Sequence, residues 1–329
     1  MENENNELEK QSPAAKPNIS ALLIAAFLGV CALASVIVVL RGTPARKTPS
    51  ITDDDGMASL LSQKKDGVGW VYLRGIISEG SSSNPFERNA SAAKRLRSLA
   101  DRKEVKAIVL DINSPGGTVA AVQELYGEIM RARKQKHKPV IALFRDVAAS
   151  GGYYAACACD QIIAQPGTLT GSIGVIFSAA NVEGLFQKVG VKSEIIKSGK
   201  FKDIGSIYRA MTPEERKLLQ GVIDDAYAQF FDAVKAGRRV PEEKLKELAD
   251  GRIFTGRQAA GLGLVDKLGG AKEALEAAGE LSGLGKEPRV IKEADAWDYL
   301  LSVLRSRSSL PALALSEISA PRLAYIWTY

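Results

Sequence analysis

The stretch VKAIVLDINSPGGTV, residues 105–119, decides the fold of this chain. Its first nine residues are a mostly apolar run, which is typical of a strand buried inside a sheet. The four residues Ser114-Pro-Gly-Gly117 predict a tight turn. Residues 118–136 then predict a long helix. A buried strand, a short turn and a helix in this order are the building unit of a layered α/β domain.

The same succession of elements continues on both sides of this unit. Thr212 and Pro213, followed by two glutamates, mark the start of a helix that runs to about residue 237. The order of elements predicts an α/β fold with a mainly parallel sheet. Further strands are predicted at residues 68–78, 139–144, 161–163 and 174–177, further helices at 90–102 and 150–160, and a turn-rich segment with a short helix at 251–270.

An uncharged apolar segment precedes this domain. Residues 19–40 would form a helix about 33 Å long, enough to cross a hydrocarbon layer of about 30 Å. The alternative is a cleaved signal peptide, because Ala32-Leu-Ala34 offers a small-x-small site. The acidic leader and the apolar run beyond that site favour an uncleaved anchor. The flanking positive charges determine the orientation of this anchor only weakly.

The predicted organisation of the chain has one soluble domain. The segments are a polar leader (1–18), a transmembrane helix (19–40), a linker (41–67), the α/β domain (68–288) and a C-terminal tail (289–329). The tail has Trp297, Leu300, Leu301 and Leu304 at helical spacing, which indicates a helix that packs on a partner or on the membrane.

Composition excludes several classes of function. The chain of 329 residues has one His and three Cys, so few common metal sites can be built, and we expect no metal. No phosphate-binding glycine motif is present, which argues against a nucleotide cofactor. The net charge is +6, but no basic patch is interleaved with aromatic residues, so nucleic acid is not an expected partner.

The single histidine is also a poor candidate for a general base. His137 lies within the basic run RARKQKHK, residues 131–138, which is typical of a solvent-exposed helix end. If the protein is a hydrolase, we therefore expect a base other than histidine.

Two glycine-rich turns are candidates for chemistry. In the first, Gly116 and Gly117 allow backbone N–H groups to face a ligand without a Cβ in the way, although a plain strand-to-helix connection has the same sequence. In the second, Ser150 is predicted at a helix N-terminus with two glycines after it. The helix dipole would stabilise negative charge there, whereas the alternative interpretation is an ordinary N-cap serine.

Five motifs follow one another along the chain: DINSPGGTV (111–119), ASGGYYAA (149–156), GTLTGSIGV (167–175), SGKFKD (198–203) and GRIFTGRQAAGLGLVDKLG (251–269). Together they resemble the signal peptide peptidase A family, which consists of membrane-bound serine proteases with a Ser-Lys dyad and a fold related to ClpP and crotonase. The resemblance spans residues 68–284, in order and with compatible spacing. It implies a ClpP/crotonase-like layered α/β domain, in the short form with one protease domain.

The resemblance also implies roles for individual residues. Ser150 matches the nucleophile, Lys202 its general base, and Ser172 the hydroxyl that orients the lysine. Gly117 and Gly151 match the glycines whose N–H groups form the oxyanion hole.

The residues alone do not select this lysine, because Lys192, Lys197 and Lys200 are close by in the sequence. A free lysine has a pKa near 10.4, and a base that works at neutral pH needs about 7. Burial produces such a shift, so we expect Lys202 to be enclosed near Ser150 in the working assembly. In the family, the two dyad members come from neighbouring subunits of a ring resembling an octamer.

The expected function is a membrane-anchored serine endopeptidase that degrades cleaved signal peptides. The resemblance places it as a single-pass protein in the inner, cytoplasmic membrane with the protease domain on the extracytoplasmic side. Its expected partners are peptide substrates, the lipid bilayer and further copies of itself, with no organic cofactor. Two alternatives remain: a crotonase-like acyl-CoA enzyme, and a catalytically inactive membrane scaffold of the same fold.

Overall fold

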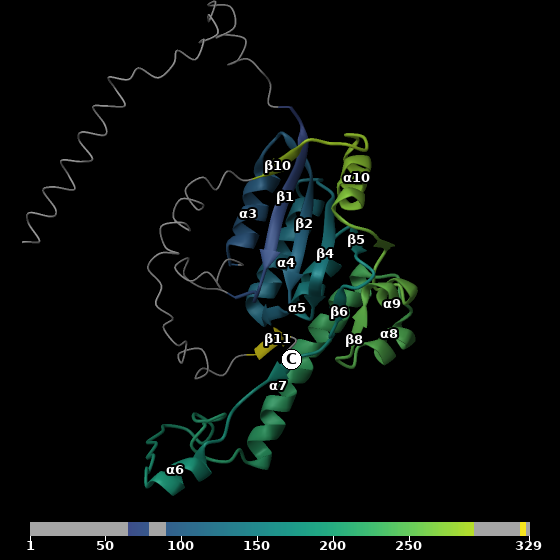
Figure 1. Ribbon diagram of the computed structural model, residues 1–329. Helices are drawn as coiled ribbons and strands as arrows, with labels where there is room; N and C mark the ends of the chain where they lie inside the picture. The colour runs from purple at the N-terminus through teal and green to yellow at the C-terminus, as the bar shows by residue number, and fades with distance from the viewer. Residues whose placement is uncertain (1–64, 79–89, 293–322, 327–329) are drawn as a thin grey trace, which may run out of the picture. The chain divides into compact units, whose positions relative to one another are not determined.

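The computed structural model describes residues 65–78, 90–292 and 323–326 (Figure 1). Its main sheet has the strand order β10-β1-β2-β4-β5-β9, and every neighbouring pair along this path is parallel. These strands are β10 Val290–Lys292, β1 Gly67–Arg74, β2 Val105–Ser114, β4 Val140–Ala149, β5 Gln161–Ala164 and β9 Lys267–Leu268. The predicted α/β class with a mainly parallel sheet is confirmed.

Helices cover both faces of this sheet. One face carries the larger core, to which α3, α4 and α5 contribute, and the other face packs against α10. The alternation of side chains along β2 explains this: Ile108 and Leu110 point into the larger core, whereas Val109 points toward α10. The helices are α3 Ala90–Asp101, α4 Val119–Lys134, α5 Gly151–Cys157 and α10 Ala271–Ser282.

Short strands and helices surround the carboxyl end of β4. The strand β6 (Leu169–Gly171) pairs in parallel with β4 and antiparallel with β8 (Ile253–Thr255). A second, small sheet has the order β3-β11-β7, formed by Gly116–Thr118, Leu323–Ile326 and Ile176–Phe177. The short helices α8 and α9 span Glu242–Leu248 and Gly256–Gly261.

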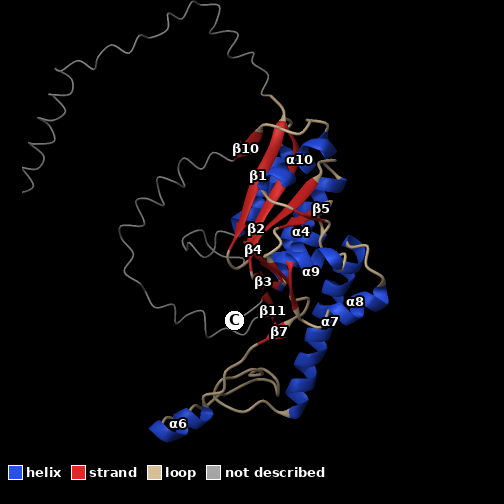
Figure 2. Cartoon of the chain, turned by 45° about the vertical axis from the view of Figure 1, so that its right-hand side comes forward, coloured by secondary structure: helices blue, strands red, loops and turns tan. Residues whose placement is uncertain are grey.

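The long helix α7 (Pro213–Gly237) begins where the sequence predicts. Thr212 accepts a hydrogen bond from the N–H of Glu215, and the Glu215 carboxylate accepts one from the N–H of Thr212, which completes a capping box. Figure 2 shows that the helix α6 (Glu183–Val189) and the loops beside it lie near the N-terminus of α7, away from the main sheet. We call residues 182–212 the extension.

Two strands lie beyond the boundaries that the sequence predicted. The strand β4 continues to Ala149, five residues beyond the predicted end, so that it leads directly into Ser150. The main sheet also continues past residue 288, because β10 pairs with β1. Within the described ranges, no helix is long and apolar enough to cross a membrane. The predicted transmembrane helix at residues 19–40 lies outside those ranges.

Candidate active site

Ser150 lies at the turn between β4 and α5, where the chain leaves the sheet and enters a helix. Its backbone has φ 52° and ψ −117°, a left-handed conformation that costs a residue with a side chain on the order of 1–3 kcal/mol. The N–H of Ser150 donates to the C=O of Gly171, and the N–H of Tyr154 donates to the C=O of Ser150. These bonds stabilise the strained turn. A serine on a sharp strand-to-helix turn is a recurring arrangement of hydrolase nucleophiles.

Ser172 occupies the equivalent position on the neighbouring strand. Since β6 runs parallel to β4 with Ala149 opposite Gly171, Ser150 and Ser172 are the next residues on two adjacent strands. Ser172 also has a positive φ, 50°, and both serines are buried. Strand register therefore brings two of the predicted site residues side by side.

Gly117 lies on β3, and this strand contacts α5, the helix that follows Ser150. The N–H of Thr118 donates to the C=O of Ile77, and the N–H of Ile77 donates to the C=O of Gly116. This pairing is so close that a Cβ at Gly117 would lie 1.8 Å from the carbonyl oxygen of Ile77. Glycine is thus required at this position for the strand to pack.

The predicted partner in the oxyanion hole, Gly151, is the first residue of α5 and is buried. N–H groups in the first turn of a helix have no acceptor within the helix, which is the property that the predicted role requires. A Cβ on the next residue, Gly152, would lie 3.1 Å from the C=O of Ser114, so the helix start packs tightly against the turn that precedes Gly117.

Lys202 is placed elsewhere. It lies on a turn of the extension and its side chain is exposed. The adjacent Asp203 is tied through Arg209 to Glu215 at the start of α7, whereas Tyr154, one turn after Ser150, packs on Phe230 of the same helix. The 15 residues between Glu215 and Phe230 correspond to about 22 Å of helix. The single chain does not bring Lys202 and Ser150 together.

The neighbouring lysines differ in their partners. Lys197 forms an ion pair with Asp203, and Lys200 forms one with Glu214. Across the described part of the chain, the ammonium groups of Lys192 and Lys202 have no such carboxylate partner. Of the four lysines that are candidates for the general base, only Lys192 and Lys202 therefore remain without an ion pair in the described part of the chain. The SGKFKD motif includes Lys202 and excludes Lys192, so it favours Lys202.

An ion-pair network holds the turn that carries Lys202. The Arg209 guanidinium hydrogen-bonds to both Asp203 and Glu215, and Asp203 also accepts from Lys197. Hydrogen bonding to Arg209 is the main cause that lowers the pKa of Asp203 far below its usual range and the pKa of Glu215 to about 2. Sequence reasoning missed this network, and the only available signal was the capping box that contains Glu215.

His137 plays no part in this site. It follows α4 with an exposed side chain, and it precedes β4, whereas Ser150 follows β4. The ten residues of that strand correspond to about 33 Å. The expectation of an exposed helix-end histidine is confirmed.

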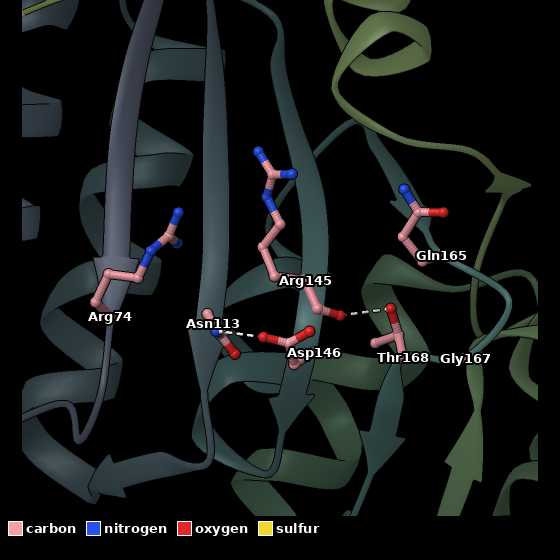
Figure 3. Close-up of a pocket in the computed structure, with 7 residues that line it drawn as sticks. All are labelled: Arg74, Asn113, Arg145, Asp146, Gln165, Gly167 and Thr168. Atoms are coloured by element: carbon pink, nitrogen blue, oxygen red, sulfur yellow. Dashed lines mark hydrogen bonds between the residues drawn. The ribbon is translucent and has the colours of Figure 1, made fainter.

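A polar pocket of about 590 Å³ lies on the sheet face opposite α5 (Figure 3). Next to it, the fully buried carboxylate of Asp111 accepts hydrogen bonds from Trp70, Arg74 and Arg145. The hydrogen bond to Asp111 raises the pKa of Arg145. This cluster joins the ends of β1, β2 and β4, and we interpret it as structural. The pocket is lined by Arg74, Asn113, Arg145, Asp146, Gln165, Gly167 and Thr168.

Among the described residues, no group of three or more His, Cys, Asp and Glu side chains is arranged to hold a metal ion. Cys157 and Cys159 are buried free thiols, and burial raises the pKa of Cys157 to about 12. Neither thiol is suited to act as a nucleophile at neutral pH.

A family model and several known proteins are similar to this chain over the region that contains the candidate site. The family model for peptidase family S49 matches residues 132–285, which include Ser150, Ser172 and Lys202. A protein from Synechocystis sp. described as a candidate protease is 49% identical over 214 residues, 65% of this chain and 74% of that protein. A protein from Enterococcus faecium described as a candidate signal peptide peptidase SppA is 38% identical, over 63% of this chain and 61% of that protein.

One solved structure is a membrane-bound stomatin-specific protease in complex with a substrate peptide. It superposes with a TM-score of 0.43 at 19% sequence identity, over 74% of this chain and all of that one.

Proposed function

Because the chain belongs to peptidase family S49, the signal peptide peptidase A family of serine proteases, we propose that it cleaves peptides through Ser150. The observation that carries this proposal is the placement of Ser150: a buried serine on a strained strand-to-helix turn, next to Ser172. The side-chain oxygen of an ordinary N-cap serine would accept a hydrogen bond from a backbone N–H in the first turn of the helix, and Ser150 forms no such bond.

The proposed reaction has two stages. The Ser150 Oγ attacks the carbonyl carbon of the scissile bond, while Lys202 accepts the hydroxyl proton and later passes it to the leaving amine. The N–H groups of Gly117 and Gly151 stabilise the oxyanion. Water then hydrolyses the acyl-enzyme and regenerates the free serine. Ser172 positions the lysine amine.

In this proposal the lysine comes from a neighbouring chain. The extension exposes an unusual set of large apolar side chains, and a soluble surface rarely leaves such a group uncovered. The exposed aliphatic side chains of the extension are Leu185, Val189, Val191, Ile195 and Ile196, of which Ile196 is fully exposed. A second copy that covers this surface would place Lys202 in a dry environment, where burial would lower the pKa of its amine.

The finer parts of the proposal concern location and substrate. Residues 19–40 would anchor the protein in the cytoplasmic membrane, with the protease domain on the extracytoplasmic side. Signal peptides left in the membrane after cleavage are the proposed substrates, and the working form is a ring of copies, such as an octamer. No metal or organic cofactor takes part in the proposed reaction.

A complementation experiment tests this dyad. Ser150→Ala and Lys202→Ala chains should each lose at least 100-fold in kcat/KM with a fluorogenic peptide. Mixed subunits should recover part of the activity, because one neighbour supplies an intact serine and the other an intact lysine. Activity in the Ser150→Ala chain alone would refute the proposal, and failure of the mixture would place both members in one chain.

Labelling separates the alternatives. A fluorophosphonate should react with the native protein at Ser150 and should not react with the Ser150→Ala chain. A crotonase-like acyl-CoA enzyme would use the glycine N–H groups without Ser150, and an inactive scaffold would hydrolyse no peptide.

A further inference from the structure

Five parallel strands of the main sheet, β1, β2, β4, β5 and β10, begin at one edge of the domain, at the top of the view in Figure 1. Backbone hydrogen bonds connect the segments that lead into them, such as the one from the N–H of Gly67 to the C=O of Glu104. Ser150 follows the other end of β4, about 33 Å away. We define the basic edge as these lead-in segments, residues 65–66, 101–106, 131–138, 158–160 and 285–289.

The basic edge carries a net charge as large as that of the whole chain. It contains eleven Lys and Arg side chains against five Asp and Glu side chains, which gives +6. Four helices, α3, α4, α5 and α10, end at this edge, and each helix C-terminus is equivalent to about half a negative charge. These helix dipoles offset about two of the positive charges, so they account for only part of the excess.

The acidic side chains of the edge leave several cations unpaired. Four of the five acids already form ion pairs within the edge, as Asp66 does with Lys106. By contrast, Lys103, Lys134 and Lys286 are exposed and, within the described ranges, have no carboxylate partner. The edge therefore presents free ammonium groups to whatever lies beyond it.

Some of the positive charges are close enough to repel one another. Lys138 donates a hydrogen bond to the C=O of Arg102. Burial, together with the charges of Lys106 and Lys136, lowers the pKa of the Lys138 amine. An anionic partner at this edge would relieve the repulsion among these lysines.

We propose that the basic edge lies against the surface of an anionic lipid bilayer, an inference that rests on the membrane location proposed above. The chain before Lys65 contains the predicted membrane helix at residues 19–40, and it joins the domain at this edge. Leu281, in the last turn of α10, is exposed at the same edge and supplies an aliphatic side chain for the headgroup layer.

Anionic lipid fits this surface better than nucleic acid does. The basic edge contains no aromatic side chain, so it lacks the platforms on which the bases of single strands stack. Each Lys or Arg near an anionic leaflet strengthens binding about fivefold. The attraction falls off within the Debye length, about 8 Å at physiological ionic strength. The proposal therefore requires the edge to lie at the headgroups.

Lysine labelling tests this contact in the complete protein. The chain is placed in nanodiscs of phosphatidylcholine, alone or mixed with anionic phosphatidylglycerol, and acetylation of each lysine is followed by mass spectrometry. We expect Lys103, Lys134 and Lys286 to react at least about threefold more slowly in the anionic nanodiscs, and high salt should remove this protection. The control is Lys244 of α8, which is exposed without a carboxylate partner in the described part of the chain and should react equally in both.

A charge variant tests the cause of the protection. Replacing Lys103, Lys134 and Lys286 together by Gln removes three charges, and the attraction to the bilayer should weaken on the order of 100-fold. Lys65, an exposed lysine that remains at the edge, should then lose its protection. A matched variant with the same change in net charge should keep it, and both variants should hydrolyse a soluble peptide at the native rate. The matched variant carries Lys217→Gln, Lys244→Gln and Lys272→Gln.

Each outcome supports or overturns the inference. Equal reactivity of the edge lysines in both nanodiscs overturns it, and so does protection that extends equally to Lys244. Protection by an RNA oligonucleotide but not by anionic lipid would assign the edge to nucleic acid and also overturn it.

Failure of the other proposals is recognised separately. If residues 19–40 are not an anchor, the chain will not stay with phosphatidylcholine nanodiscs. Salt-sensitive binding to anionic nanodiscs alone would then support the contact, and no binding would overturn it. Hydrolysis of a soluble peptide that depends on Ser150 tests the protease function without any lipid.

Discussion

The surroundings of Ser150 and those of Lys202 are built in opposite ways. Every residue of α5, the helix that follows Ser150, is buried, whereas α6, at the start of the extension that carries Lys202, has no buried residue. Ser150 is held by backbone hydrogen bonds to two neighbouring elements, and Lys202 lies on a turn stabilised by the ion pairs of Arg209 with Asp203 and Glu215. One half of the proposed dyad is thus organised by the fold of a single chain, whereas our proposal requires a second copy to enclose the other half.

This contrast predicts how substitutions in each region should affect folding and activity. Substitutions near Ser150 should affect the stability of the fold and the activity together, because the site is part of the core. Substitutions in the extension should affect activity with little change in folding. The following predictions test this division.

The largest combined effect on folding and activity is expected for Gly117→Ala. The added methyl group would lie 1.8 Å from the carbonyl oxygen of Ile77, so β3 must move and lose its backbone hydrogen bonds. We expect the free energy of unfolding to fall by about 2–3 kcal/mol and kcat/KM to fall at least 100-fold. Urea denaturation and peptide hydrolysis measure the two effects.

The matched control for this substitution is Gly127→Ala. Gly127 lies on an exposed face of α4, where an added Cβ meets nothing within 4 Å. The free energy of unfolding should rise by up to about 1 kcal/mol, because alanine favours the helix, and activity should not change. A Gly117→Ala protein that behaved like this control would show that β3 does not form part of the site.

A second large effect is expected for Asp111→Asn on the other face of the sheet. The buried carboxylate forms ion pairs with Arg74 and Arg145, and asparagine would remove the negative charge on which both ion pairs depend. We expect a loss of about 3 kcal/mol in the free energy of unfolding by urea denaturation. Where the extension meets α7, Glu214→Gln removes an exposed ion pair between α7 and Lys200 of the extension and should cost less than about 0.5 kcal/mol. Equal costs would contradict the contrast between core and extension.

Much of the fold was predictable because its signals are local. The apolar run before Asn113 and the capping residues at Thr212 each describe a few neighbouring residues, and the structure has a strand and a helix at these places. The position of Ser150 between a strand and a helix was predictable in the same way.

The parts that could not be predicted depend on pairing between distant segments. Register between β4 and β6 places Ser172 beside Ser150, and only the resemblance indicated it. The strand β11 has only four residues, 323–326, and an apolar pattern of this length is too short to predict a strand. These residues belong to the segment that we predicted as a C-terminal tail. Lys202 is exposed in the single chain, so its predicted enclosure in an assembly stays a prediction.

A smaller effect on folding, with a clear effect on activity, is expected for Arg209→Ala. This change removes the contacts that tie Asp203, next to Lys202, to the start of α7. We expect kcat to fall about tenfold, because the general base is no longer held in position, while the urea midpoint changes little. The control is Lys200→Ala, which removes only an exposed ion pair on the same turn and should leave kcat nearly unchanged. Normal turnover in the Arg209→Ala protein would show that the extension does not position the base.

The smallest effect is the titration of Glu215, which lies in the first turn of α7 and is paired with Arg209 of the extension. The pKa of Glu215 is lowered to about 2, first by the Arg209 guanidinium and then by the backbone N–H of Thr212. Because the folded pKa lies below the ordinary value near 4.3, this carboxylate stabilises the extension fully above about pH 5. Its contribution is lost as the pH falls through about 2. Carboxyl carbon NMR should give this midpoint in the native protein. In the Arg209→Ala chain the midpoint should rise but stay below 4.3, because Thr212 still donates to the carboxylate. A native midpoint near 4 would mean that Arg209 and Glu215 are not paired in solution, and the extension would then lack the anchor that distinguishes it from an ordinary surface loop.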